Sequence, residues 1–334
     1  MYDALLVVSF GGPEAQGDVI PFLENVLRGK NVPRERMLEV AEHSYHFGGK
    51  SPINDQNRAL IAALHPALAA AGISLPIYWG NRNWQPMLAD TLRQMANDGV
   101  KRALAYATSA FSSYSGCRQY RQDIAAARAA VGDAAPEIDK LRVFFNHPGF
   151  IGAVTARVRD AFDRIPAERR AAAALIYTAH SIPISMSQSS DYVAQLRESA
   201  GLVTQAIGHG SYSLVYQSRS GPPSQPWLEP DIGAHLREIR EAGVTDAVVV
   251  PLGFISDHME VLFDLDTEAA ELSNEIGLNM VRAGTAGTHP DFVGTIVDLV
   301  AERLDPMRPR LALGTMGIRP DVCPPDCCAP PTRR

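Results

Sequence analysis

Two short motifs about 80 residues apart carry the side chains best suited to chemistry. The first, residues 178–183, contains His180, and the second, residues 254–260, ends at Glu260. Each motif follows a short run rich in β-branched residues, which is typical of a strand. An imidazole opposite a carboxylate suits a site that holds a borderline divalent metal and also moves protons. The two motifs therefore indicate metal chemistry on an organic ligand.

A lone histidine after a strand is commonly a structural residue, so His180 taken alone leaves both interpretations open. The pair Ile182 and Pro183 forces an extended exit from the strand, which presents the histidine outward. Parallel α/β sheets collect functional groups just past the carboxyl ends of their strands. We therefore expect His180 and Glu260 to face each other across one cleft.

Acidic residues continue beyond the second motif at a spacing of four. Glu260, Asp264 and Glu268 occupy positions i, i+4 and i+8, and Glu271 extends the row. On a helix these carboxylates form one stripe, although like charges at this spacing repel each other. Two interpretations remain open: a solvated acidic face above a buried apolar side, or a path for a hydrated cation or protons.

Eight β-rich segments alternate with helical windows along the chain, which predicts an α/β fold with parallel sheets flanked by helices. Eight strands divide into two sheets of four, so we expect two domains, 1–145 and 146–312, followed by a Cys-rich tail, 313–334. The expected strands are 5–9, 75–80, 103–108, 142–146, 175–178, 213–217, 247–251 and 279–283. Expected helical windows include 56–71, 87–97, 149–164, 232–242 and 267–276.

Composition narrows the classes of function. The 334 residues include 31 basic and 37 acidic side chains, giving a net charge of −6 without a basic tract. Nucleic acid is therefore excluded as an expected partner. Apolar runs fall short of the roughly 20 residues that a membrane-spanning helix needs, and the N-terminus lacks secretory-signal features. We expect a cytoplasmic protein with no stable membrane association.

The chain has four cysteines: Cys117 in mid-chain, and Cys323, Cys327 and Cys328 within six residues of a Pro-rich tail. Four cysteines are too few for a secreted disulfide scaffold of this length. Four thiolates form a complete ligand set for an iron–sulfur cluster or a structural zinc ion. They could also be unrelated thiols on a frayed tail. Ligation is favoured, because three unligated thiols so close together would be a reactive liability.

A third set of polar residues offers hydrogen-bond donors suited to carboxylates on a ligand, although ordinary surface charge explains most of them singly. It includes Arg28, His43, His46, Lys50, Ser51, Arg58, Tyr114, Arg118 and Tyr120.

Five strings together resemble the ferrochelatases, and most closely the actinobacterial type that acts on coproporphyrin III. They are SFGGP at 9–13, FGGKSPIN at 47–54, TAHSIP at 178–183, QSRSGP at 217–222 and PLGFISDHME at 251–260. The resemblance spans nearly the whole chain. It implies two Rossmann-like domains, each with a four-stranded parallel sheet, and a porphyrin bound in the cleft between them.

The resemblance also implies roles for single residues. The catalytic histidine and glutamate of the family correspond to His180 and Glu260, a pair that binds the incoming ferrous ion and takes protons from the pyrrole nitrogens. A secondary acidic path is implied at Asp257, His258, Asp264 and Glu268.

The same resemblance implies a porphyrin site with two departures from the family pattern. Ser51 and Tyr114 match positions that contact the porphyrin, and Arg28 resembles a propionate-binding arginine. Phe10 stands where enzymes from other Gram-positive bacteria have a tyrosine that ligates iron in the product complex. His43 lies near the position of an arginine in those enzymes, so one propionate contact differs.

The four cysteines resemble the ligands of the 2Fe–2S cluster in some ferrochelatases, although the adjacent Cys327 and Cys328 are unlike the animal enzymes. The implied function is insertion of ferrous iron, as substrate, into coproporphyrin III to give coprohaem in haem biosynthesis. A transient contact with the next enzyme of that pathway is also implied. The alternatives are a protoporphyrin IX ferrochelatase, a chelatase such as one placing cobalt into sirohydrochlorin, and a non-catalytic iron–sulfur or haem-carrying protein.

Overall fold

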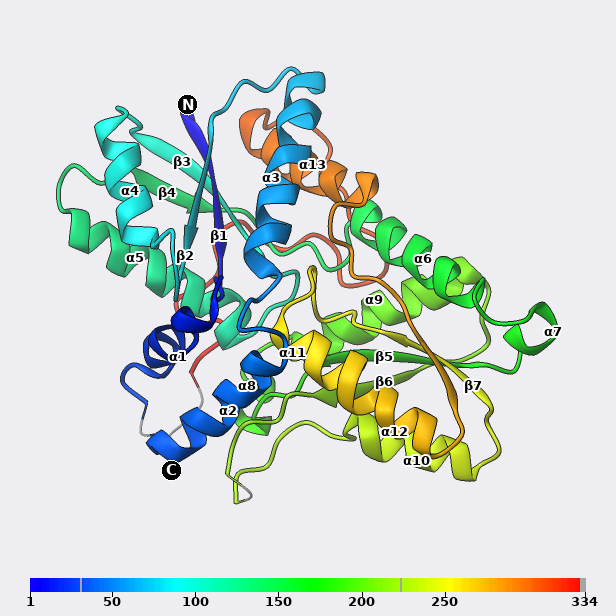
Figure 1. The fold of residues 1–334 in the computed structure, drawn as a ribbon. Helices are drawn as coiled ribbons and strands as arrows, with labels where there is room; N and C mark the ends of the chain where they lie inside the picture. Colours follow the sequence, from blue (N-terminus) through cyan, green and yellow to red (C-terminus); the bar gives the residue numbers. More distant parts are fainter. Residues whose placement is uncertain (31, 223, 331–334) are drawn as a thin grey trace.

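The computed structural model describes residues 1–30, 32–222 and 224–330, which form two four-stranded parallel sheets flanked by helices (Figure 1). The strand orders are β2-β1-β3-β4 and β6-β5-β7-β8, so the two sheets share one topology, as a duplicated α/β unit would. The strands are β1 (Ala4–Ser9), β2 (Ile77–Asn81), β3 (Arg102–Ala107), β4 (Glu137–Lys140), β5 (Ala174–His180), β6 (Ser213–Gln217), β7 (Asp246–Val250) and β8 (Asn279–Arg282). The α/β class and the two parallel sheets expected from the sequence are confirmed.

Helices occupy most of the connections between strands. Those of the first half are η1 (Gln16–Asp18), α1 (Val19–Leu27), α2 (Arg34–His46), α3 (Ile53–Ala70), α4 (Leu88–Asn97), the π-helix η2 (Tyr114–Arg118) and α5 (Gln119–Val131). Those of the second half are α6 (Pro148–Phe162), α7 (Ala167–Arg170), α8 (Ile184–Gln188), α9 (Tyr192–Ile207), α10 (Ile232–Glu241), α11 (Met259–Val261), the π-helix η3 (Leu262–Ala269), α12 (Ala270–Glu275) and α13 (Pro290–Leu304). In the part of the chain that the structure describes, no helix is long and apolar enough to cross a bilayer.

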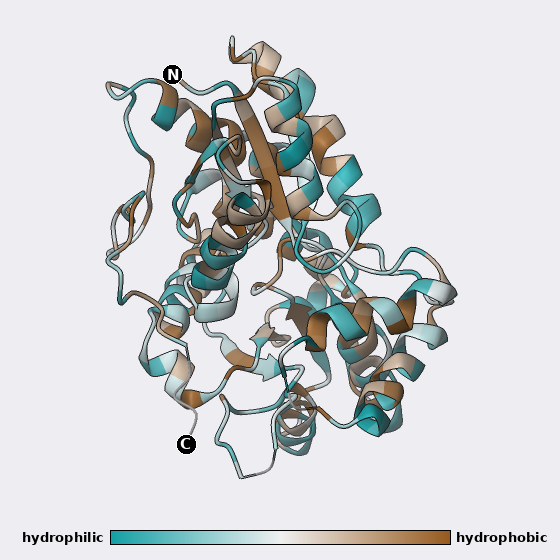
Figure 2. Cartoon of the chain, turned by 90° about the vertical axis from the view of Figure 1, so that its left-hand side faces the viewer, coloured by the Kyte–Doolittle hydropathy of each residue, from teal (hydrophilic) through white to brown (hydrophobic). Residues whose placement is uncertain are grey.

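The central strands are apolar on both faces because helices cover both sides of each sheet. All six residues of β1 and all five of β7 are buried. One apolar cluster runs from Leu5 in β1 through Phe144 to Val248 in β7. In Figure 2 the long strand in the upper half of the molecule is brown, while the helices beside it mix teal and brown turns. The two sheets therefore share a continuous core.

One expected strand is wrong. Residues 142–146 are buried but irregular, and the edge strand β4 lies earlier, at Glu137–Lys140. The apolar residues Phe144 and Phe145 pack against the core between the sheets instead of pairing with β3. An edge strand has one neighbour and one exposed edge, so the charged sequence of β4 is compatible with pairing there. The prediction was wrong because it placed the strand at the most apolar segment, whereas the edge strand is charged.

The C-terminal helix and tail tie the two halves together. Helix α13 packs on both α3 and α6. Beyond it, the Arg118 guanidinium of the first half donates to the Cys327 carbonyl (3.2 Å), and the Ser189 hydroxyl of the second half donates to the Ala329 carbonyl (3.0 Å). We propose 1–145 and 146–312 as the two domains, because each range contains one complete sheet, with 313–334 as the tail. Residues 331–334 lie outside the described part.

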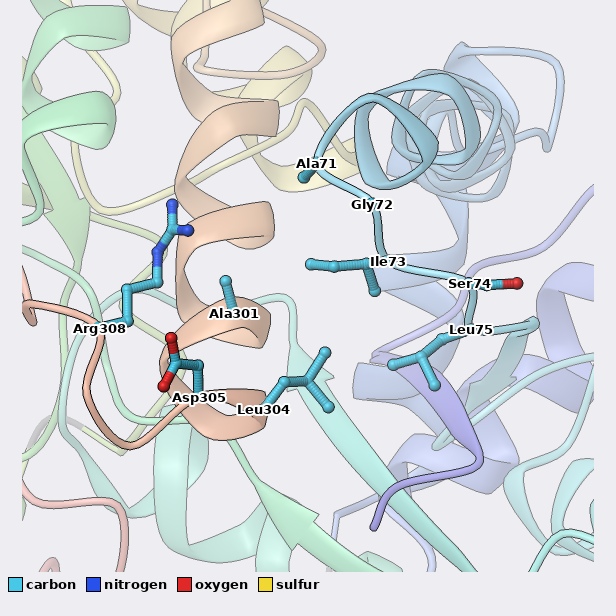
Figure 3. A pocket seen from close by; sticks show the side chains of 9 residues that line it. All are labelled: Ala71, Gly72, Ile73, Ser74, Leu75, Ala301, Leu304, Asp305 and Arg308. Carbon is cyan, nitrogen blue, oxygen red and sulfur yellow. The ribbon is translucent and has the colours of Figure 1, made fainter.

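A shallow pocket of about 350 Å³ lies where α3 and α13 end (Figure 3). Ala301 and Leu304 form one side, and Ile73 and Leu75 form the other. None of the residues expected to act in chemistry lines this pocket.

Candidate active site

His180 and the segment that leads to Glu260 leave neighbouring strands at the same sheet edge. His180 is the last residue of β5, and Val250, the last of β7, pairs with Tyr177 of β5. A Cβ on Gly253 would lie 2.7 Å from the Ala179 Cα, so only glycine lets the β7 loop approach β5 this closely. As expected from the sequence, the two functional side chains meet: the His180 Nε2 lies 3.9 Å from the Glu260 Oε1.

The Glu260 carboxylate lies between two imidazoles. Its second oxygen, Oε2, lies 3.9 Å from the Nδ1 of His258. The His180 Nδ1 contacts the carbonyl oxygen of Ser181, which leaves its Nε2 directed toward Glu260. His180 and Glu260 keep 32% and 55% of their side-chain surface exposed, so a ligand can reach both.

Charge is unevenly distributed within this group. Burial lowers the pKa of His180, but the neighbouring Glu260 carboxylate outweighs it, and the pKa is raised above 6.5. Burial would raise the pKa of Glu260, but His180, His258 and Lys30 lower it to about 2. The pKa of His258 is lowered, mainly by burial. At neutral pH Glu260 is therefore ionised.

Asp264 follows Glu260 along the stripe and is half-buried. Its carboxylate accepts hydrogen bonds from the Ser218 hydroxyl and from the Gln217 amide (3.2 Å). Burial, together with the charges of Glu260 and Glu268, raises the pKa of Asp264 to about 6. Ser218 has a φ of 62°, a left-handed conformation that is uncommon outside glycine. Strained backbone of this kind concentrates at functional sites.

The helix that carries the stripe differs from the α-helix expected from the sequence. After the short α11, residues 262–269 form the π-helix η3, and α12 follows. The buried residues Val261, Leu265 and Ala269 recur every fourth position, as the acidic residues do. A π-helix has more residues per turn than the 3.6 of an α-helix, so this strict period keeps both rows aligned. The sequence analysis noted this period of four but expected an ordinary helix from it, not a π-helix.

Asp257 precedes the stripe, and its contacts differ from those of the stripe carboxylates. Its Oδ1 lies 3.1 Å from the Arg282 Nη1, and Arg282 also pairs with Asp266. Its backbone N–H donates to the Gln56 Oε1 (2.9 Å), which links α3 to the second domain. Asp257 therefore fixes the loop before Glu260, while Asp264 and the exposed Glu268 continue the stripe toward solvent.

The residues expected to contact porphyrin lie on the first domain. Ser51 is buried. A Cβ at position 12, just after β1, would lie 2.7 Å from the Ser51 Cβ, so glycine is needed at position 12. Tyr114 is the first residue of η2, and its hydroxyl donates to the Gln122 side chain of α5 (3.0 Å). Arg28 is exposed at the end of α1 and donates to Asn25. Phe10 follows β1.

Sequence reasoning missed several neighbours of these residues. The Arg82 guanidinium lies over the Phe10 ring at 5.6 Å and pairs with Asp123. The His43 ring of α2 stacks on the Phe263 ring of η3 with centroids 3.8 Å apart. The first domain therefore contacts the helix that carries Asp264.

Comparison with known proteins identifies the family of this chain. The family described as Ferrochelatase matches residues 2–304. The chain belongs to the ferrochelatase family. Members of this family are enzymes that insert iron into a porphyrin.

Three curated relatives cover nearly the whole chain. A ferrochelatase of Rhodopirellula baltica is 60% identical over 100% of this chain and 95% of its own length. The coproporphyrin III ferrochelatase of Nocardia farcinica is 49% identical (99% and 97% covered), and that of Streptomyces coelicolor is 50% identical (98% and 93%). The expected closest similarity to coproporphyrin III enzymes is not confirmed, because the Rhodopirellula relative shares more residues.

Solved structures agree on the fold. Two structures of the Bacillus subtilis chelatase SirB, one in complex with cobalt and one with Fe³⁺, match with TM-scores of 0.55 and 0.57. Each is 14% identical and covers 90% of this chain and 95% of the other. At this identity the match supports the chelatase architecture alone.

The four cysteines also come together. Cys117 is buried in η2, and Cys323 and Cys328 lie near enough to shift its pKa. The Cys327 and Cys328 sulfurs lie 3.5 Å apart. The Cys323 and Cys328 thiols lower the pKa of Cys117, and Cys117 in turn raises the pKa values of those two thiols. Cys328 has a left-handed φ of 53°, which places adjacent cysteines in one group.

These thiols test whether an iron–sulfur cluster fits. Within the described residues no group of three His, Cys, Asp or Glu side chains is close enough to hold a single metal ion. A 2Fe–2S cluster makes a different demand, because it would be held by four cysteine thiolates and is not a single-ion site. Four free thiols in one half-buried group match that donor set.

Proposed function

We propose that this enzyme inserts ferrous iron into coproporphyrin III, giving coprohaem for haem biosynthesis. The observation that carries the proposal is the Glu260 carboxylate between His180 and His258, at 3.9 Å from each. The relatives named for coproporphyrin III, at 49% and 50% identity, support the choice of porphyrin. A substrate with four carboxylates also suits the cationic Arg28, Lys30 and Arg82 of the first domain.

The reaction exchanges two protons for one metal ion. Two pyrrole N–H bonds break, the four nitrogens bind Fe²⁺, and two protons must leave. A neutral imidazole accepts a proton, whereas an imidazolium cannot. His180 takes protons at Nε2 when it is neutral, and ionised Glu260 stabilises the imidazolium that forms. Both groups also offer ligands that a divalent iron accepts.

An incomplete ligand set suits a metal that has to be released. Among the described residues, no group of three ligands encloses an ion. His180 and Glu260 offer only two ligands, so they would hold iron weakly, and transfer to four pyrrole nitrogens is favoured. We propose that His180 and Glu260 hold iron only during this transfer.

The stripe beyond Glu260 supplies a path to solvent. Asp264 has a pKa of about 6, so it gains and loses a proton close to neutral pH. Glu268 is exposed and lies near enough to raise that pKa. We propose that Asp264 and Glu268 carry protons outward or hydrated iron inward, with Asp257 and His258 positioning the start of the path.

Porphyrin binding supplies the remaining free energy. A flat macrocycle hides its nitrogen lone pairs, so an out-of-plane distortion lowers the barrier to metal entry. Strain of this kind, about 1–5 kcal/mol, comes from contacts remote from the reacting atoms. Arg28 and Ser51 would bind propionates, Tyr114 would contact the macrocycle, and Phe10 would line it without offering an oxygen ligand to iron.

We also propose that Cys117, Cys323, Cys327 and Cys328 bind a 2Fe–2S cluster. Such a cluster supplies one-electron chemistry. In this chain the thiols would fix the tail to η2, because three of them follow residue 313 and the fourth lies in the first domain.

Anaerobic assays with coproporphyrin III and protoporphyrin IX side by side test the proposed substrate. We expect rapid loss of the free coproporphyrin absorbance bands and little change with protoporphyrin. A preference for protoporphyrin would keep the mechanism and change the substrate. Insertion into neither would favour a regulatory or haem-carrying protein, and turnover of cobalt with sirohydrochlorin would favour another chelatase.

A further inference from the structure

A second pocket, of about 280 Å³, lies between α5, β4 and the tail, beside the cysteine group. Cys117 and Cys323 form part of its lining. Its wall carries six basic and only two acidic side chains, Asp139 and Asp321. The basic residues are Arg121, Arg128, Lys140, Arg142, Arg303 and Arg319.

Both acidic side chains pair with Arg303 of the wall, at 3.7 Å for Asp139 and 3.9 Å for Asp321, but they bind other groups more closely. Asp139 accepts hydrogen bonds from Tyr2 and Arg102, and Asp321 accepts one from Arg310 at 2.8 Å. Tyr2, Arg102 and Arg310 lie outside the pocket lining. Arg142 pairs with Glu302 and Arg319 with Asp191, so the excess positive charge of the wall comes from the other three basic residues.

Three of the cations lack an acidic partner. Among the described residues, Arg121, Arg128 and Lys140 form no ion pair with a carboxylate. The Arg128 Nε donates instead to the Pro136 carbonyl (2.8 Å), and the Lys140 Nζ donates to the Leu141 carbonyl (3.0 Å). Each keeps N–H donors free for a ligand.

A buried guanidinium adds an independent observation. The Arg142 side chain is 1% exposed, and its Nε and Nη2 bind Glu302 at 2.9 and 2.8 Å. Its Nη1 is buried without a hydrogen-bond partner in the described part of the chain. Buried donors of this kind are normally satisfied, so an unpartnered N–H on a pocket-lining residue points to a missing acceptor.

We propose that this pocket binds a small multivalent oxoanion bearing phosphate or carboxylate groups. The volume suits a molecule of that size, and Arg guanidinium groups match the oxygen geometry of both groups. One wall consists of tail residues 319–323, while α5, β4 and the end of α13 supply the others. A bound anion therefore joins the tail to the first domain at the cysteine group.

The cations also lie close to the thiols: Lys140 and Arg121 both contribute to lowering the pKa of Cys117. A simpler use of the same charge is to offset the thiolates or the cluster itself. Arg128 lies farther along α5 and Arg303 lies on α13, so the wall extends beyond the cysteines, which a role confined to them does not require. The cluster content of the protein under test therefore has to be known.

The test is isothermal titration of anaerobically purified protein, with its cluster content measured by visible absorbance. Pyrophosphate and citrate are the probes, at constant ionic strength set with KCl. We expect saturable binding at one site. Arg121→Gln with Lys140→Gln should weaken it more than about tenfold, because two charge-assisted hydrogen bonds are lost. Arg93→Gln with Lys101→Gln removes the same charge from exposed positions and should change it less than about twofold.

Each outcome decides the proposal. Binding of pyrophosphate alone assigns a phosphate ligand, and binding of citrate alone assigns a carboxylate; both support the site. The single variant Arg128→Gln, at an exposed position, repeats the test if the double variant does not fold. The proposal is overturned if neither probe binds, if the pocket variants bind as tightly as the control, or if binding occurs only in protein that lacks the cluster.

Discussion

The Nε2 of His180 and the Oε1 of Glu260 lie 3.9 Å apart, although about 80 residues separate them in the chain. The carboxylate raises the pKa of the imidazole, and the imidazole helps to lower the pKa of the carboxyl to about 2. A divalent ion that enters the pair competes with the proton on His180. Metal binding is therefore expected to release protons.

Glu260→Gln should lower the pKa of His180 below 6.5, because the burial that remains disfavours the imidazolium. The measurement is a pH titration of the histidine ring signals by NMR on metal-free protein. Glu268→Gln, which removes a carboxylate farther along the stripe, is the matched control and should leave this pKa almost unchanged. An unshifted His180 in the Glu260 variant would show that the pair does not interact.

The same pair should contribute to stability within a defined pH window. The lowered pKa of Glu260 gives stability that is present above about 4.5 and is lost as the pH falls toward 2. The raised pKa of His180 gives stability that is present below 6.5 and is lost as the pH rises through its folded-state value. The free energy of unfolding lost in Glu260→Gln should peak between pH 4.5 and 6.5.

Since Glu260 is 55% exposed, that loss should stay below about 1 kcal/mol. Urea unfolding at pH 3, 5.5 and 8 measures it. A loss that keeps growing toward pH 3 would contradict the assigned pKa directions.

Asp264→Asn should stabilise the protein at pH 7 and slow iron insertion. Because the pKa of Asp264 rises from 3.8 to about 6 on folding, its ionisation opposes folding, and stability falls as the pH rises from 4 to 6. An amide removes that cost, and its oxygen still accepts from Ser218 and Gln217. We expect about 1–2 kcal/mol at pH 7, less than the full shift because the site is partly solvated. Thermal unfolding at pH 4 and 7 measures it, and equal gains at both pH values would contradict the raised pKa.

Glu302→Gln should destabilise the protein by about 3–5 kcal/mol, because it leaves the buried Arg142 without its charge partner. Glu275→Gln, at an exposed position on α12, is the matched control and should change the free energy of unfolding by less than about 0.5 kcal/mol. Urea unfolding measures both. A loss below about 1 kcal/mol for Glu302→Gln would show that the pair does not hold the tail carbonyl of Leu311 and α13 in place.

The sequence predicted the features that depend on local patterns. Strand runs and helical windows gave the two parallel sheets, and the rule that functional groups follow strand ends placed His180 beside Glu260. The crowding of three cysteines in the tail predicted a group with Cys117, and the structure places Cys117 near them, while their ligation of a cluster stays a prediction.

Features set by tertiary packing were missed. The apolar segment around Phe144 and Phe145 is typical of a strand, yet both residues pack in the core between the two sheets. The stacking of His43 on Phe263 joins residues 220 positions apart, and no local pattern announces it. Arg82 gave no signal in its own segment, because its role comes from Phe10 and Asp123 on other elements. Long-range contacts of this kind follow from the fold and not from spacing.

The most direct measurement is anaerobic single-turnover iron insertion by His180→Ala, with porphyrin binding followed by absorbance in the same samples. We expect insertion to fall by more than about a hundredfold while porphyrin still binds, because the main proton acceptor is gone. His65→Ala, an exposed histidine on α3, should behave like the unaltered protein. Near-normal turnover in His180→Ala would contradict the proposed role of the pair.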